Sequence, residues 1–263
     1  MHMKIWYQSY TQIGVDPAWK VYEDDLKAYL RKVARPDTSI DVYGVNVLVP
    51  KLFESDYIQH LHVAQIVDAA LQAEREGYDA FCLGGTLDLG YSCIKEVLDI
   101  PAVFIGESSF LTACMVSRSF AIVGQGEKSL RRKMQLVREY GLDQRCVPGG
   151  HMGSNNLEII GWIANDPQRL IDMFSQAVRQ AIANGAGSLI PGFGAIGSFL
   201  GQREIHAIDG VPIIDIVAVT VKNAEMLVDL RKLGLSPGRA AFGNNTSKEE
   251  LLDARRKYGV APG

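Results

Sequence analysis

Short apolar segments that alternate with amphipathic segments constrain the fold of this chain more than any other feature. Residues 80–84 form a short apolar run between glycines, and residues 57–76 ahead of it carry apolar side chains at helical spacing. Met3–Gln8, residues 102–105 and Ser188–Pro191 resemble further short strands. Apolar strands joined by helices are typical of a parallel sheet with helices on both faces. The pattern predicts an α/β fold.

The rest of the chain continues this alternation. A helix is expected over residues 16–33, because Asp16 is a favoured N-cap and Pro17 fits the first helical position. Near the other end, a capped polar helix is expected over Lys248–Lys257, after a loop that begins at Ser236. The other segments with strand or helix character are residues 39–48, 94–98, 119–123, 145–147, 177–184 and 213–217.

A weak internal repeat relates two parts of the chain. Residues 73–105 and 181–216 each pass from a helix end through a glycine, a strand, a glycine-rich turn and a helix to a proline and a further strand. The repeat predicts two similar lobes with pseudo-twofold symmetry and a ligand cleft between them, although any doubly wound sheet contains units of this kind. We expect residues 1–118 and 220–263 in the first lobe and residues 119–219 in the second.

Composition excludes several classes of protein. The 263 residues are 47% hydrophobic and 22% charged, with a formal net charge of −3, and the basic residues form no stripe for nucleic acid. No apolar run has the length of a membrane span and the N-terminus does not resemble a secretory signal, so a cytoplasmic protein is expected. There is no dinucleotide fingerprint, phosphate loop or metal-ligand spacing, so we expect no cofactor and no metal. The expected partner is a small-molecule substrate, with homo-oligomer formation left open.

Two parts of the chain resemble a known family. GYDAFCLGGTLDLG, at residues 77–90, and LDIPAVFIGESS, at residues 98–109, resemble the first catalytic segment of hydantoin racemases. NGAGSLIPGFGAIG, at residues 184–197, and GVPIIDIVAVTVKNAEML, at residues 210–227, resemble the second. The chain is thus similar to the aspartate/glutamate/hydantoin racemases over most of its length. The resemblance implies their two-lobe scaffold, with a pocket at the strand ends.

In that family two cysteines on opposite sides of a substrate carbon exchange its α-proton, and neither cysteine stands at its expected place here. The resemblance puts the first at Gly85 and the second at Phe193, or at Gly192 after a shift of one residue. Cys82, inside the preceding strand, is expected in the buried core. Glycine and phenylalanine cannot transfer protons, so racemisation by paired thiols is not expected. The arylmalonate decarboxylases, relatives with one cysteine, also have glycine at the first position.

Several other groups are candidates for the chemistry. Backbone N–H groups of the turn at Gly85 and Thr86 suit a carboxylate or an oxyanion, unless the glycines serve only the turn geometry. The catalytic candidates are Thr86, His151 and Glu107, although His151 fits an exposed loop and Glu107 or Asp88 fits a helix's first turn. Phe193 would make its side of the pocket apolar and suit a planar ring. The expected substrate-binding residues are Tyr7, Gln8, Ser9, Gly85, Thr86, Ser108, Gln125, Gly192, Phe193 and Gly194.

These residues leave three functions open. The favoured one is an altered reaction on a small carboxylate or a cyclic amide or imide. In it, either a water in the space left at Gly85 attacks a carbonyl, or the turn stabilises an enolate while a side group departs. The second function is a racemase or isomerase with other bases on the two sides of the substrate. The third is a ligand-binding protein without catalysis.

Overall fold

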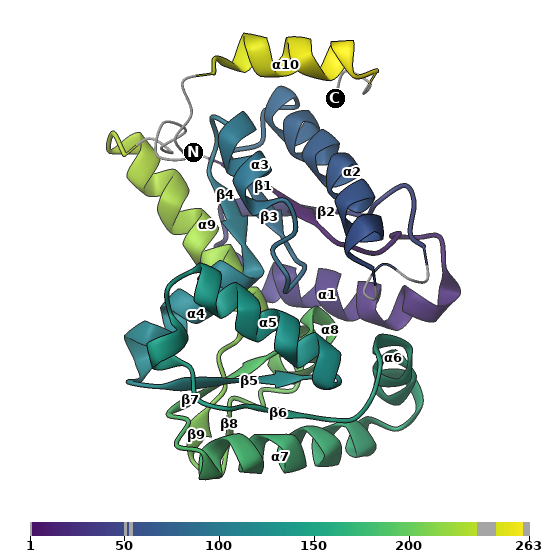
Figure 1. Ribbon diagram of the computed structural model, residues 1–263, viewed down its shortest axis with the longest axis vertical. Coiled ribbons are helices and arrows are strands. Elements are labelled where there is room, and N and C mark those ends of the chain that lie inside the picture. The colour runs from purple at the N-terminus through teal and green to yellow at the C-terminus, as the bar shows by residue number, and fades with distance from the viewer. Residues whose placement is uncertain (1, 50–51, 53–54, 236–245, 260–263) are drawn as a thin grey trace.

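The computed structural model, which describes residues 2–49, 52, 55–235 and 246–259, contains two parallel sheets (Figure 1). The first sheet has the order β2-β1-β3-β4, with β1 at Met3–Gln8, β2 at Thr38–Tyr43, β3 at Ala80–Leu83 and β4 at Ala102–Phe104. The second has the order β6-β5-β7, with β5 at Phe120–Gly124, β6 at Gly150–His151 and β7 at Ser188–Pro191. The α/β fold with parallel sheets that the alternation predicted is confirmed.

Helices pack against both sheets. Those that contact the first sheet are α1 (Lys20–Val33, after a 3-10 turn at Pro17–Trp19), α2 (Asp56–Arg75), α3 (Tyr91–Val97) and α9 (Ile216–Lys232). Those that contact the second are α5 (Glu127–Glu139), α7 (Pro167–Ala183) and α8 (Gly194–Gln202), while α4 (Ile105–Val116) touches both. The remaining elements are α6 (Asn156–Asn165), a 3-10 turn at Asp143–Arg145, a hairpin of β8 (Ala207–Ile208) and β9 (Val211–Pro212), and α10 (Lys248–Lys257).

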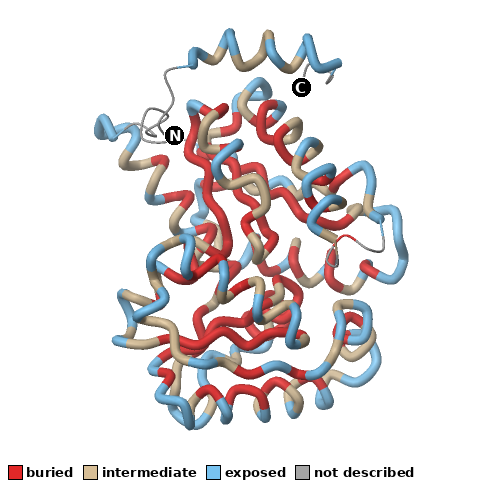
Figure 2. Tube along the Cα trace, viewed as in Figure 1, coloured by how far each residue is buried: buried red, intermediate tan, exposed pale blue. Residues whose placement is uncertain are grey.

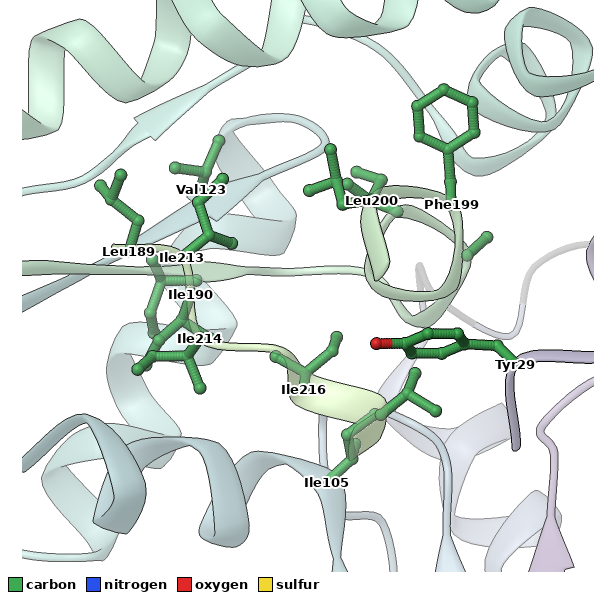
Figure 3. Close-up of a cluster of buried hydrophobic side chains, with 14 of the residues drawn as sticks. Tyr29, Ile105, Val123, Leu189, Ile190, Phe199, Leu200, Ile213, Ile214 and Ile216 are labelled. Atoms are coloured by element: carbon green, nitrogen blue, oxygen red, sulfur yellow. The ribbon is translucent and has the colours of Figure 1, made fainter. Parts of the chain in front are cut away.

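One apolar core runs from the first sheet into the second. Figure 2 shows buried residues along the strands of both sheets and on the inner sides of the helices. Figure 3 shows the region where the two parts meet, with Ile105 and Ile216 beside Tyr29 and with Val123 and Leu189 from the second sheet. The continuous burial of these side chains fixes the position of one sheet relative to the other.

Strand direction decides which turns meet. In the first sheet β1 and β3 run parallel with Gln8 beside Leu83, so the turns that follow them leave the same edge. In the second sheet β5 and β7 run parallel with Val123 beside Pro191, so the segment after Gly124 lies near the glycine-rich turn after β7. Ligands in open α/β folds bind beyond such carboxyl ends.

Three expected elements differ from the structure. The strand expected over residues 39–48 ends at Tyr43. The strand expected after Pro212 pairs with β7 only at Ile213, beside Leu189, because the Asp215 side chain accepts a hydrogen bond from the Ala218 N–H at 2.9 Å and caps a helix. The strand expected over residues 145–147 is reduced to a parallel bridge between Cys146 and Phe120, because a 3-10 turn ends at Arg145 and β6 follows further along the chain.

The expected C-terminal helix is confirmed as α10, while the loop expected from Ser236 falls on residues 236–245, outside the described residues. Ser247 and Glu250 form a capping box at the start of α10. The helix rests on α2 through ion pairs from Lys248 to Glu74 and from Arg255 to Asp68. No described helix combines the length and apolar character that a membrane crossing requires.

Candidate functional site

A cavity of about 690 Å³ lies where the carboxyl ends of the two sheets meet. The first sheet contributes residues 9–12 and 84–87, which follow β1 and β3. The second sheet contributes residues 125–129 and residues 193–194, which follow β5 and β7, and residues 154–157 come from the start of α6. A cavity of this size suits a small molecule.

The two glycine-rich turns touch each other directly. The Thr86 hydroxyl donates a hydrogen bond to the Gly192 carbonyl oxygen at 2.9 Å, and a Cβ at Gly194 would lie 3.2 Å from the Gly84 carbonyl oxygen. The Gly192 N–H donates to the Val123 carbonyl oxygen at 2.8 Å. The Thr86 hydroxyl and the Gly192 carbonyl oxygen therefore hold the two turns together, while the Gly192 N–H ties its own turn to β5.

The side chain of Tyr10 fills the space at Gly85. A Cβ built on Gly85 would lie 2.0 to 2.3 Å from three carbon atoms of the Tyr10 ring, closer than any real contact. The ring is held in place because the Leu89 N–H donates to the Tyr10 hydroxyl oxygen at 2.6 Å. The expectation that a water occupies the space left by the missing cysteine is therefore wrong: a phenol from the turn after β1 stands there.

The two expected general bases do not line the cavity. Glu107 lies in the first turn of α4 and accepts hydrogen bonds from Lys95 at 2.7 and 2.8 Å and from the Tyr91 hydroxyl at 2.6 Å. His151 is exposed at the end of β6, where its Nδ1 accepts from the Gly153 N–H at 3.2 Å. Glu107 thus has an ion-pair partner outside the cavity, and His151 faces solvent.

Asp88 caps the helix that follows β4. Its carboxylate accepts hydrogen bonds from the Gly106 N–H at 2.9 Å, the Glu107 N–H at 2.7 Å and the Tyr140 hydroxyl at 2.8 Å. Burial raises the pKa of Asp88 to about 7, and these three donors act against that rise. The carboxylate ties the turn after β3, whose residues 84–87 line the cavity, to the start of α4.

Replacing Asp88 with alanine is expected to lower the free energy of unfolding by roughly 1–3 kcal/mol, because two buried N–H groups lose their acceptor. Chemical denaturation measures this loss. Asp143→Ala, in an exposed turn, is the control and should change stability by less than about 0.5 kcal/mol. Equal stability of the two variants would contradict the capping role.

The other sequence candidates divide between the cavity wall and the layer beneath it. Tyr7 lies under the first turn, since a Cβ at Gly84 would be 2.5 Å from its hydroxyl oxygen. Gln8 accepts from the Trp6 indole at 3.0 Å and donates to the Ser9 carbonyl oxygen at 3.0 Å. The candidates that line the cavity are Ser9, Gly85, Thr86, Gln125, Phe193 and Gly194. Those that do not are Tyr7, Gln8, Glu107, Ser108, His151 and Gly192.

Lys133, which sequence reasoning missed, stands in the cavity wall on α5. Its side chain is only 3% exposed, and a Cβ at Gly192 would lie 3.1 Å from its Cε atom. Burial lowers the pKa of Lys133 to about 7, and the positive charge of Arg132 lowers it further. The Lys133 amine therefore loses its proton far more readily than an ordinary lysine.

A chain of hydrogen bonds orients that amine. Lys133 Nζ donates to Ser129 Oγ at 2.6 Å and lies 3.4 Å from Gln125 Oε1. Ser129 Oγ in turn donates to Gln125 Oε1 at 2.6 Å, and Gln125 Nε2 donates to Asn156 Oδ1 at 2.9 Å. Because both neighbours of Lys133 act as acceptors, the amine donates its N–H groups to them and keeps its lone pair for a proton.

The sequence held a signal for Lys133. Leu130, Lys133 and Val137 share one face of α5 at helical spacing, so a lysine occupies a position where the pattern calls for an apolar residue. A buried lysine is rare unless it has a function or a partner.

None of the four cysteines lines the cavity. Cys82 is fully buried in β3, as expected, and burial raises the pKa of its thiol well above the ordinary value. Over the described part of the chain, no group of three His, Cys, Asp or Glu side chains is placed to hold a metal ion. The ionisable side chains that line the cavity, among the described residues, are those of Tyr10, Asp16, Tyr22, Glu127, Lys128, Arg132 and Lys133.

Comparison with known proteins identifies the family. The model of the Asp/Glu/Hydantoin racemase family matches residues 20–224. A hydantoin racemase from Pseudomonas sp. (strain NS671) is 30% identical over 230 residues, which cover 87% of this chain and 88% of that protein. The solved allantoin racemase from Klebsiella pneumoniae superposes with a TM-score of 0.75 at 22% identity, covering 93% of this chain and 95% of the other. That from Pseudomonas fluorescens gives 0.72 at 23% identity, covering 90% and 94%. The chain belongs to the Asp/Glu/hydantoin racemase family of enzymes.

Proposed function

We propose that this protein is a racemase or isomerase that moves a proton at a carbon beside a carbonyl, with Lys133 as the base and Tyr10 as the acid on the opposite lobe. The observation that carries the proposal is the buried Lys133 amine in the cavity wall beside the second glycine-rich turn. Tyr10 occupies the corresponding place at the first turn. An amine and a phenol thus stand near the two positions where relatives are expected to carry thiols.

The proton transfer balances without a cofactor. The neutral Lys133 amine removes the proton from the substrate carbon, and the electron pair of that C–H bond moves onto the carbonyl as an enolate. The Tyr10 hydroxyl then delivers a proton to the other face of the carbon. Return of a proton from the Lys133 ammonium to the phenolate, through water, restores the starting state.

The environments of the two groups suit these roles. The Lys133 amine has a pKa of about 7, close to the pH at which a general base is most effective. Burial raises the pKa of Tyr10 well above its ordinary value, which keeps the phenol protonated and able to donate. The Leu89 N–H donates to the same oxygen and stabilises the phenolate that forms.

The comparisons favour this proposal over hydrolysis or decarboxylation. The relatives and solved structures just described are named as hydantoin and allantoin racemases. Hydrolysis by a water at Gly85 would also need space that the Tyr10 ring fills. Proton exchange needs only groups that line the cavity.

The Tyr10→Phe variant tests whether Tyr10 and Lys133 act on opposite faces of the substrate carbon. It keeps the ring against Gly85 and removes the proton donor, so it should lose racemisation and still exchange the α-proton of one enantiomer. We would incubate both enantiomers of 5-substituted hydantoins, allantoin and 2-substituted carboxylic acids in heavy water. NMR would report deuterium uptake, and chiral chromatography would report inversion.

Wild-type protein should incorporate deuterium with inversion, and Tyr10→Phe should incorporate it with retention. Tyr57→Phe, on the exposed part of α2, is the matched control and should behave as wild type. Racemisation by Tyr10→Phe at the wild-type rate would refute the role of the phenol. Hydrolysed product in place of exchange would refute the isomerase proposal as a whole.

A further inference from the structure

One backbone N–H holds the hydroxyl of Tyr10. The Leu89 N–H donates to the Tyr10 hydroxyl oxygen at 2.6 Å, and the Tyr10 ring lies against Gly85 in the cavity wall. Because the oxygen accepts this bond with a lone pair, its own O–H points away from Leu89 and stays available to another acceptor. The position of the Leu89 amide therefore decides where the Tyr10 proton can be delivered.

The backbone beside Leu89 is left-handed on both sides. Asp88, the residue before it, has a φ of 46°, and Gly90, the residue after it, has a φ of 80°. Glycine adopts this region without cost, whereas aspartate does so at a cost that its surroundings must offset. The Asp88 N–H donates to the Gly85 carbonyl oxygen at 3.1 Å and closes the turn. The direction of the Leu89 N–H thus depends on what holds Asp88 in this conformation.

The Asp88 carboxylate fixes that conformation from outside the turn. Asp88 is only 3% exposed, and its carboxylate accepts from the Gly106 N–H at 2.9 Å and the Glu107 N–H at 2.7 Å, both in α4. The Tyr140 hydroxyl, at the end of α5, donates to it at 2.8 Å. Hydrogen bonds to an ionised acceptor are stronger than those between neutral groups. Donors from two helices therefore anchor the side chain of Asp88, and with it the left-handed turn.

The close approach of this carboxylate to α4 requires a glycine. A Cβ built on Gly106 would lie 2.6 Å from Asp88 Oδ2 and 2.9 Å from Asp88 Cγ, closer than real Cβ atoms come. Gly106 lies in the first turn of α4, where glycine is a poorer helix former than alanine. Any side chain at this position would push the carboxylate away from its donors.

We infer that Asp88 is a positioning residue for the proposed acid: its carboxylate holds the left-handed turn that presents the Leu89 N–H to Tyr10. This inference rests on the proposed function for the reaction and adds the residue that determines where the acid delivers its proton. Asp88 itself does not line the cavity and acts through Leu89. Loss of its carboxylate should impair delivery by Tyr10 and leave proton removal by Lys133 intact.

The partition between inversion and retention measures this placement. One enantiomer of a 5-substituted hydantoin would be incubated in heavy water at about pH 8, where Lys133 is mostly neutral and Asp88 mostly ionised. A reaction without protein gives the background. Asp88→Ala should lower inversion per deuterium incorporated at least about tenfold, because a misplaced donor delivers poorly. Deuterium uptake from the enantiomer that faces Lys133 should stay close to that of the wild type, whereas partial unfolding would lower both quantities together.

Two gentler variants and a matched control keep the result specific. Asp88→Asn keeps one acceptor oxygen and tolerates the left-handed region, so its partition should lie between those of wild type and Asp88→Ala. Gly106→Ala keeps Asp88 but displaces its carboxylate, so it should reproduce Asp88→Ala. Gly161→Ala, in α6 with open space at its Cβ position, should keep the wild-type partition. Thermal melting would show that each variant is folded, and the two gentler variants decide the question if Asp88→Ala is not.

A double variant tests whether Asp88 acts through the phenol. In the Tyr10→Phe background, which already lacks the donor, Asp88→Asn should not change the partition further, since the two changes affect the same hydroxyl. A further change there would overturn the inference. A wild-type partition in both Asp88→Asn and Gly106→Ala would also overturn it, as would an equal change in Gly161→Ala.

Hydrogen exchange at the Leu89 amide tests the placement without a substrate. NMR should show this N–H exchanging at least about tenfold faster in Asp88→Ala and Gly106→Ala than in the wild type, because its hydrogen bond opens more often. That result in a protein without α-proton exchange would support the placement of Tyr10 by Asp88 and refute the proposed function. Racemisation that depends on Tyr10, with Leu89 unchanged in both variants, would support the proposed function and refute the role of Asp88.

Discussion

Replacing Lys133 with methionine is expected to lower the rate of proton exchange by about a hundred- to ten-thousand-fold and to make the protein more stable. The rate falls because the amine that we propose as the general base is lost from the cavity wall. Stability rises because the folded wild type must either bury a charge or release a proton at this position. Each unit by which folding lowers the pKa corresponds to about 1.4 kcal/mol. Heavy-water exchange and urea denaturation measure the two effects.

Both effects depend on pH in a defined direction. Activity of the wild type should fall as the pH falls through about 7, because protonation removes the free amine. Between about 7 and the ordinary value of 10.5 the unfolded chain binds more protons at Lys133 than the folded protein does, so wild-type stability rises with pH there. The stability advantage of Lys133→Met is therefore full below pH 7 and vanishes toward pH 10.5.

Two further variants make the Lys133 result specific. Lys133→Arg keeps the positive charge without a usable lone pair, so it should be inactive and also less stable than wild type. Arg131→Met, on the exposed side of the same helix, should change neither rate nor pH profile. Proton exchange by Lys133→Met at the wild-type rate would show that Lys133 is not the base. A Lys133→Met variant that is slower but keeps the wild-type pH profile would show the same.

Adding a single methyl group at Gly85 is expected to destabilise the protein by about 1–3 kcal/mol or more, because the new Cβ would lie 2.0 Å from the Tyr10 ring. The ring would have to leave its place and give up the hydrogen bond from the Leu89 N–H. In a Tyr10→Ala background the same change should cost about 0.5–3 kcal/mol less, since the obstructing ring is gone. Denaturation of the two single variants and the double variant measures this coupling.

Gly161→Ala is the control for Gly85→Ala. Gly161 lies in α6 with no neighbour within 4 Å of its Cβ position, so alanine there should raise stability by roughly 0.5–1 kcal/mol. Because the Tyr10 ring occupies the space beside Gly85, the Gly85→Cys variant should not gain thiol chemistry at the first turn as long as Tyr10 is present. Additive costs for Gly85→Ala and Tyr10→Ala would show that the ring does not occupy this space.

Features of the site that depend on local sequence were predictable. The apolar runs and the glycines around them located β1, β3 and β7, because a buried parallel strand requires such a run. The segments around Gly85 and Phe193 indicated both the family and the absence of thiols at the expected positions. Ser9, Thr86 and Gln125 were expected at strand ends, and these three line the cavity.

Tertiary structure decided which side chains stand beside the two glycine-rich turns. Tyr10 reaches Gly85 because β1 and β3 are parallel neighbours, and Lys133 reaches Gly192 because α5 follows β5, the neighbour of β7. Helical periodicity puts Lys133 on the inner face of α5 but does not show whether that face meets core or cavity. The sequence by itself determined β1, β3 and β7, the glycine-rich turns that follow β3 and β7, and the residues other than cysteine at Gly85 and Phe193. Only the packing of the two sheets determined which side chains border the cavity, because those contacts join residues far apart in the chain.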